Sequence, residues 1–165
     1  MRQEYSIFIL SLQFLTRIPV RSDDHYSELR MAEIPRYFPL VGALIGTAGG
    51  AVFLVANELL SLGSAVLVCV AATVALTGAF HEDGLADTFD GVGGGTSKSR
   101  ALEIMRDSRV GTYGTLAVVV ALLLKIALLT ELPARHIPTA LILGHTVSRL
   151  SSVLVLIQGR YVRDE

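Results

Sequence analysis

The sequence predicts an all-α fold, a polytopic membrane helix bundle with about four transmembrane helices and an amphipathic helix at its N-terminus. The first observation is composition: 18% of the residues are charged, against about 25% in soluble domains, and mean hydropathy is +0.56. The second is a series of long apolar segments, which lipid forces into helices because every backbone group must bond internally. The third is the grouping of basic residues between these segments. We expect residues 1–165 to form one membrane domain.

Four segments are long enough to cross a bilayer, which takes about 20 apolar residues. The first two contain no charged residue, the third contains only Lys125, and the fourth contains only Arg149 besides two histidines. These segments are residues 37–57, 59–80, 110–130 and 136–159.

The N-terminal segment has the pattern of an amphipathic helix. Its apolar residues recur at steps of three and four, as on one helix face, whereas Glu4 and Arg17 interrupt any longer apolar run. We expect this helix to lie on the membrane surface or to pack beside the spans. The stripe consists of Tyr5, Phe8, Ile9, Leu12 and Leu15.

The basic residues predict the orientation of the bundle. With the N-terminus inside, the inner segments 1–36, 81–109 and 160–165 hold eleven of the fourteen Lys and Arg residues, and the outer turns hold only Arg135. Cytoplasmic loops carry such an excess, so we expect the N-terminus and residues 81–109 in the cytoplasm. The net charge of −1 gives no basic field for nucleic acid.

A ridge of glycines lies in the first predicted span, at Gly42, Gly46 and Gly50. Small residues four apart let another helix approach closely. The ridge is compatible with helix association, including a homo-oligomer.

The run "HEDGLADTFDGVGGG" (residues 81–95) follows the second span and places several acids close together. If the helix of that span continues past Phe80, then Asp83, Asp87 and Asp90 share one face. Like charges at this spacing repel, and a divalent cation between them would relieve the repulsion; oxygen ligands suit Mg²⁺, Mn²⁺ or Ca²⁺. The alternative is a polar cap of acids at the membrane interface.

The segment after the acids supplies positive charge. The glycines of "GVGGG" are expected to be flexible and to let the chain fold back over the acids. On a helix, "LEIMRDSRVGTYG" (residues 102–114) would pair Glu103 with Asp107 and Arg106 with Arg109 at helical spacing. Carboxylates for a metal and guanidinium groups for phosphate are the groups that phosphoryl transfer requires.

Three further basic residues each have two interpretations. Arg149, one turn after His145, either contacts an anionic substrate group or pairs with an acid from another span. Lys125 has a structural or snorkelling role. Arg17, in "FLTRIP", reaches either a substrate phosphate or a lipid headgroup.

Four blocks of the sequence resemble signature blocks of the adenosylcobinamide-GDP ribazoletransferase family, also called cobalamin-5′-phosphate synthase. The resemblance implies a Mg²⁺-dependent enzyme of the bacterial or archaeal cytoplasmic (inner) membrane. Such an enzyme transfers the adenosylcobinamide-phosphate group of adenosylcobinamide-GDP to α-ribazole or its 5′-phosphate and releases GMP. This reaction belongs to the last stage of nucleotide-loop assembly in cobalamin biosynthesis. The blocks are "FLTRIPV", "YFPLVGALIG", "TGAFHEDGLADTFDG" and "LEIMRDSRVGTYG".

The resemblance and the residue pattern together give a site hypothesis. Glu82 stands where the family usually has an apolar residue, so it is not counted as a ligand. The chain ends at Glu165 where the family continues with further spans, so we expect the N-terminal portion of a longer pattern. The predicted metal ligands are Asp83, Asp87, Asp90 and Asp107. The predicted substrate contacts are Arg106, Arg109, Arg149 and Arg17, and the predicted catalytic residues are Asp83, Asp87, Asp90 and His81, with one aspartate or His81 taking the proton.

Other functions remain open on the sequence alone. The pattern D-G-x-A-D-x-x-D is loosely similar to that of CDP-alcohol phosphotransferases, which release CMP rather than GMP. A transporter or cation channel could use the acids as an ion site, although transporter sites usually lie at the midplane. An inactive remnant of the enzyme is a further alternative.

Overall fold

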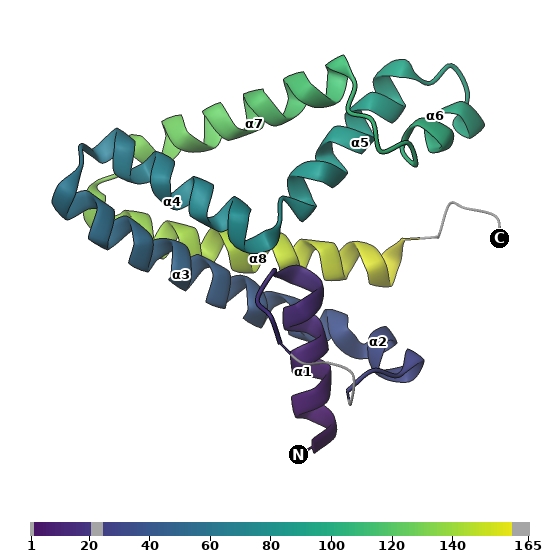
Figure 1. Ribbon diagram of the computed structural model, residues 1–165, viewed down its shortest axis with the longest axis horizontal. Coiled ribbons are helices and arrows are strands. Elements are labelled where there is room, and N and C mark those ends of the chain that lie inside the picture. The colour runs from purple at the N-terminus through teal and green to yellow at the C-terminus, as the bar shows by residue number, and fades with distance from the viewer. Residues whose placement is uncertain (1, 21–24, 160–165) are drawn as a thin grey trace.

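The computed structural model describes residues 2–20 and 25–159, and every regular element in this part of the chain is helical (Figure 1). The predicted all-α fold is therefore confirmed. The elements are α1 (Arg2–Leu15), α2 (Glu28–Glu33), η1 (Ile34–Tyr37), α3 (Phe38–Leu59), α4 (Leu62–Thr77), α5 (Phe80–Gly94), α6 (Lys98–Ile104), α7 (Thr112–Thr130), η2 (Ala134–His136) and α8 (Ile137–Gln158).

The helices form a polytopic membrane bundle, as predicted. Three helical segments are long and apolar enough to cross a membrane, namely Glu28–Leu59, Thr112–Thr130 and Ala134–Gln158. The helices α4 and α5 meet this standard only as a pair, across a bend of 85°. Counting the pair as one broken span gives the expected four.

The connections alternate between two ends of the bundle. Figure 1 shows the α3–α4 and α7–α8 connections at one end, and α1, α2, α5 and α6 toward the other. Lys98 and Arg100 of α6 thus lie at the end opposite Arg135 of η2, as the grouping of basic residues predicts. Arg21, Arg160 and Arg163, which the prediction also used, lie outside the described residues.

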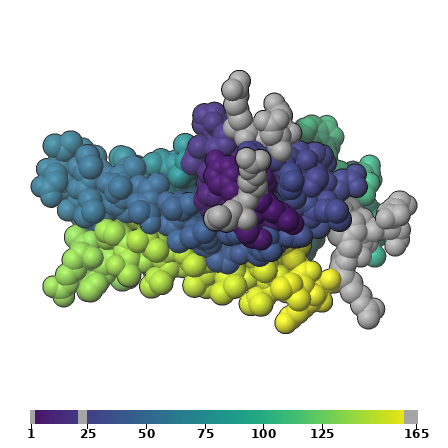
Figure 2. Space-filling model, turned by 90° about the horizontal axis from the view of Figure 1, so that it is seen from below, coloured from purple at the N-terminus to yellow at the C-terminus, as the bar shows by residue number. Residues whose placement is uncertain are grey.

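The glycine ridge brings α3 into backbone contact with α8. A Cβ atom added at Gly46 would lie 2.5 Å from Ile142 Cα, and one added at Gly50 would lie 3.3 Å from Pro138 Cα. Figure 2 shows α8 lying along α3 on one face of the molecule. The ridge is thus a close-packing surface, as predicted, and the helix that it packs against belongs to the same chain.

Helix α1 packs beside the spans, which was one of its two expected positions. Ile7 and Leu10 are buried against Val41 and Ile45 of α3. The predicted stripe is wrong in part, because Tyr5 is 58% exposed whereas Ile7 is fully buried. The buried face packs against α2, η1 and α3 and lies to one side of the predicted stripe.

The span expected over residues 59–80 ends as α4 at Thr77, and its helix does not continue into the acidic run. Gly78 (φ 65°) and Ala79 (φ 58°) both adopt the left-handed conformation, and α5 starts afresh at Phe80. Left-handed residues cannot continue a right-handed helix. The break is costly for Ala79, because its Cβ disfavours positive φ.

The glycine run is helical rather than flexible, a second correction. Helix α5 continues to Gly94, and its glycines make room for close contacts: a Cβ at Gly91 would lie 2.5 Å from Met105 Cγ. The chain does fold back, since α6 packs on α5. Helix α6 ends at Ile104, so Arg106, Asp107 and Arg109 lie in a turn and not on the expected helix.

Replacing Gly46 by leucine should weaken the α3–α8 contact, because backbone cannot move aside as a flexible side chain can. Overpacking of this kind typically costs about 2 kcal/mol. We expect the midpoint of thermal unfolding in detergent to fall by about 4–8 °C. Fluorescence-detected size-exclusion chromatography after heating measures this midpoint.

The matched control is Gly63→Leu in α4, where an added Cβ meets no heavy atom within 4 Å. Equal unfolding midpoints for the two variants would show that the α3–α8 contact is not tight.

Candidate functional site

The three predicted aspartates share one face of α5, and their environments differ. Asp83 and Asp87 lie one turn apart, Asp83 exposed and Asp87 half-buried, and the structure shows no hydrogen bond to either carboxylate from the described residues. Asp90 is only 8% exposed. Asp83 lies in the first turn of α5, where the positive end of the helix dipole stabilises a negative charge.

Asp90 binds the N-terminal end of α7. Its Oδ2 accepts a hydrogen bond from Gly111 N at 2.6 Å, and its Oδ1 accepts one from Gly114 N at 2.8 Å. Both amides belong to the first turn of α7 and have no partner inside that helix. A Cβ at either glycine would overlap the carboxylate. The two glycines of "GTYG" therefore allow Asp90 to act as the N-cap of another helix.

Asp107 is held by Arg109. The Nε atom of Arg109 donates to both carboxylate oxygens of Asp107 at 3.0 Å. This hydrogen bonding lowers the pKa of Asp107 to about 2 from an ordinary 3.8. The pair therefore stays ionised at any pH near neutrality. Arg106 lies in the same turn, with an exposed side chain that makes no hydrogen bond or ion pair to the described residues.

Arg17 and Asp83 line one cavity of about 470 Å³, at the junction of α1, α4 and α5. Arg17 N donates to Leu76 O at 2.7 Å, which fixes the segment after α1 on the end of α4. The Arg17 side chain lies against Gly78, where a Cβ would overlap it. The guanidinium of Arg17, the carboxylate of Asp83 and the N-terminal end of α5 thus face the same cavity. The guanidinium and the helix end both bind anions.

The structure brings some predicted site residues together and separates others. Arg17 and Asp83 meet, and Asp107 and Arg109 meet. Arg149 lies in α8 beside His145 and not in this cavity.

Of the four predicted metal ligands, only Asp83 and Asp87 are left to bind a metal ion. No three His, Cys, Asp or Glu side chains converge on a metal position within residues 2–20 and 25–159. Asp90 and Asp107 are engaged with backbone amides and with Arg109. Asp83 and Asp87 remain, and Mg²⁺ is typically bound through one or two carboxylates together with substrate phosphates and water.

His81 and Glu82 lie outside the cavity that Arg17 and Asp83 line. Together with Lys125 of α7 they line a second cavity, of about 240 Å³, on the side of α5 that faces α7. The catalytic role predicted for His81 stays a prediction, and His81 does not line the cavity that contains Asp83. Glu82 was not counted as a ligand on the sequence, and in the structure it has a charged neighbour, the half-buried Lys125 of α7.

The fold and the site define a polytopic membrane protein that carries an acidic helix at one end of its bundle. The chain belongs to the cobalamin-5-phosphate synthase family, whose model matches residues 7–165. No solved structure matches it.

Curated relatives of this chain bear the name adenosylcobinamide-GDP ribazoletransferase. The protein of Shewanella amazonensis is 46% identical over 99% of this chain and 64% of its own length. That of Shewanella baltica is 44% identical over 99% of the chain and 63% of its own length. That of Shewanella woodyi is 40% identical over the whole chain and 65% of its own length. The chain thus spans slightly less than two thirds of these relatives.

Replacing Asp90 by alanine should destabilise the protein, because two backbone N–H groups, one buried and one partly buried, lose their acceptor. Such a loss costs about 1–3 kcal/mol. The control is Asp83→Ala, an exposed acid without a hydrogen bond, for which we expect a change within about 0.5 kcal/mol. Thermal unfolding and proteolysis of residues 105–111 measure the effect. Equal stability of both variants would refute the capping role.

Proposed function

We propose that this chain forms the metal- and diphosphate-binding part of an adenosylcobinamide-GDP ribazoletransferase. Such an enzyme joins adenosylcobinamide-GDP to α-ribazole or its 5′-phosphate and releases GMP. Family membership supports this assignment. The observation that carries it is the placement of Asp83 and Asp87 on one face of α5, with Arg17 in the cavity beside Asp83.

The chemistry requires charge neutralisation rather than a covalent intermediate. A hydroxyl oxygen of the ribazole attacks the phosphorus that carries the cobinamide arm, and the bond from this phosphorus to the oxygen of GMP breaks. Phosphoryl transfer depends mainly on positioning and electrostatics. Arg17 would bind phosphate oxygens at the N-terminal end of α5, and Arg106 would bind them from the turn before α7.

Asp83 and Asp87 are the residues that would hold Mg²⁺. A bound Mg²⁺ supplies charge neutralisation of the diphosphate and of the departing GMP oxygen. The hydroxyl proton passes to an aspartate of α5; His81, which faces α7, is the alternative acceptor. Asp90 contributes by fixing α7 and the turn that carries Arg106.

The location of the site follows from the distribution of charge. We place α5 and α6 on the cytoplasmic side of the inner membrane, because their end of the bundle carries most of the basic residues. Nucleotide substrates would reach the site from that side.

Asp87→Asn tests the metal assignment. Loss of one charge that stabilises the transition state costs about 10²–10³-fold in rate. We therefore expect the rate of GMP release by membranes carrying this chain to fall by about that factor, and half-maximal activity to require more Mg²⁺. Chromatography of the nucleotide products measures both effects and also separates GMP from the CMP of a CDP-alcohol enzyme.

The matched control is Glu131→Gln, an acid-to-amide change at the opposite end of the bundle, which should leave GMP release unchanged. GMP release by Asp87→Asn at the wild-type rate and Mg²⁺ requirement would overturn the assignment.

Replacing the two arginines of the turn by alanine should have different effects on KM and on stability. Arg106 is available to phosphate, so Arg106→Ala should raise KM for adenosylcobinamide-GDP about tenfold, which corresponds to about 1.4 kcal/mol. Arg109 is engaged by Asp107, so Arg109→Ala should affect the stability of the turn more than KM. Initial rates at varied substrate concentration separate these effects; a larger KM change in Arg109→Ala would reverse the two roles.

A further inference from the structure

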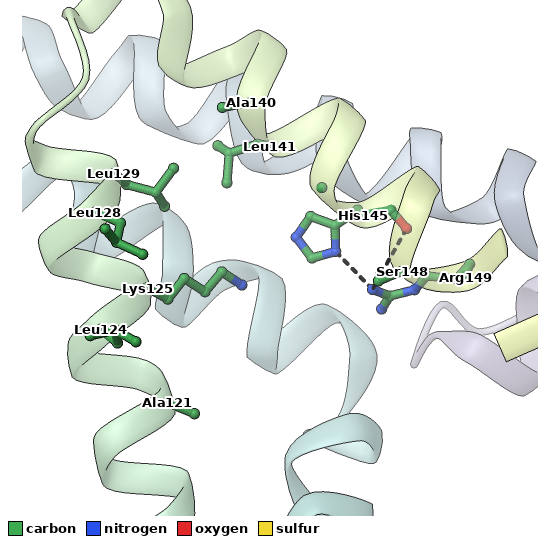
Figure 3. A pocket seen from close by; sticks show the side chains of 11 residues that line it. Ala121, Leu124, Lys125, Leu128, Leu129, Ala140, Leu141, His145, Ser148 and Arg149 are labelled. Carbon is green, nitrogen blue, oxygen red and sulfur yellow. Dashed lines mark hydrogen bonds between the residues drawn. The ribbon is translucent and has the colours of Figure 1, made fainter. Parts of the chain in front are cut away.

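A cavity between α7 and α8 lies apart from the cavity of Arg17 and Asp83 and adjoins that of His81 and Glu82, with which it shares Lys125. It has a volume of about 570 Å³ and is lined by Leu124, Leu128 and Leu141 among other apolar residues. Its polar groups come from Lys125, His145, Ser148 and Arg149. Figure 3 shows Lys125 of α7 extending toward His145 of α8, with Arg149 one turn further along α8.

Three groups facing this cavity are hydrogen-bond donors, namely the Lys125 ammonium, the Arg149 guanidinium and His145 Nε2. Arg149 Nη1 lies 3.1 Å from His145 Nδ1. A guanidinium has no acceptor, so His145 Nδ1 must accept, and in the neutral ring Nε2 then carries the proton. The Nε2 of His145 and the Nε of Arg149 are buried without a hydrogen-bond partner. Together with the Lys125 ammonium they outnumber the one buried carboxylate oxygen that lacks a partner among the described residues, Glu82 Oε2 in the adjoining cavity.

The charge of this region is also unbalanced. Arg149 is 5% exposed and His145 is 8% exposed, and neither Arg149 nor Lys125 forms a salt bridge within the described residues. Glu82 is the acid in the adjoining cavity, where it shares the lining with Lys125. One carboxylate therefore faces two cations, and one positive charge is left over.

We propose that this cavity binds the phosphate group of an amphiphilic ligand. The tetrahedral phosphate would accept hydrogen bonds from Arg149, His145 and Lys125, which approach from two different helices, and its charge would balance the excess. The apolar part of the ligand would lie against the leucines. A planar carboxylate accepts in one plane only and matches this arrangement less well.

The proposal makes an unusual prediction for stability. Neither the buried Arg149 nor the half-buried Lys125 has an acidic salt-bridge partner in the described part of the chain, and replacing buried charges by apolar residues of similar volume is often neutral or stabilising. Arg149→Met and Lys125→Met should therefore unfold at the same temperature as the unliganded wild type or at a higher one. If the two cations instead served only to hold Glu82, both replacements would lower the unfolding temperature.

The experiment measures the unfolding midpoint of the chain in maltoside detergent, with and without dodecyl phosphate. We expect the wild-type midpoint to rise by about 5 °C or more at saturating ligand. Arg149→Met and Lys125→Met should show no rise, and Arg149→Lys should show a smaller one. The matched control Arg135→Met, in η2, removes an exposed arginine and should respond as the wild type does.

Further ligands test whether the phosphate group is required for the rise and whether it comes from a lipid or from a soluble phosphate. Dodecanol, which has the chain without the phosphate, and laurate, which has a carboxylate instead, should give little or no rise; an equal rise with either would overturn the proposal. A rise with inorganic phosphate would support a soluble phosphate as the source. A phospholipid that co-purifies with the wild type but not with Arg149→Met, detected by mass spectrometry, would support a lipid. A response of Arg149→Met equal to that of the wild type would overturn the proposal.

Discussion

The hydrogen bonds from the first turn of α7 to Asp90 are the contact on which the geometry of the site depends. Helix α5 leaves α4 through a bend of 85°, so α4 alone does not fix its direction. The carboxylate of Asp90 joins it to α7 by two short bonds to backbone amides. With α5 fixed at both ends, Asp83 and Asp87 have a defined orientation, and Arg106 lies in the turn that leads into the capped helix.

Much of the fold can be predicted from the sequence because a segment that crosses lipid must be apolar and must satisfy its backbone groups within a helix. The first, third and fourth spans were predicted to within about two residues, since each is a long, largely apolar segment with at most one Lys or Arg. The end of α4 could not be predicted in this way. The apolar run continues to Phe80, and the left-handed conformation of Ala79 has no signature in composition or periodicity. The left-handed Gly78 ends α4, and Arg17 contacts both Gly78 and Leu76 O at this point.

The candidate site was predictable where it depends on local spacing. Asp83 and Asp87 are four residues apart, so any helix places them on one face, whether or not it continues from the span. The environment of Asp90 depends on residues more than twenty positions away, and spacing does not reveal it. The same is true of Arg149: the sequence allows an acidic partner, and only the three-dimensional arrangement shows that a histidine and a serine surround it instead.

The shortness of α4 has a consequence for the surrounding bilayer. Its 16 residues rise about 24 Å, whereas the hydrocarbon layer is about 30 Å thick. A helix shorter than the hydrocarbon is accommodated by local thinning of the lipid. The membrane should therefore be indented where α4 meets α5. Water could then reach the first turn of α5 at a depth that is hydrocarbon elsewhere, without a channel through the protein.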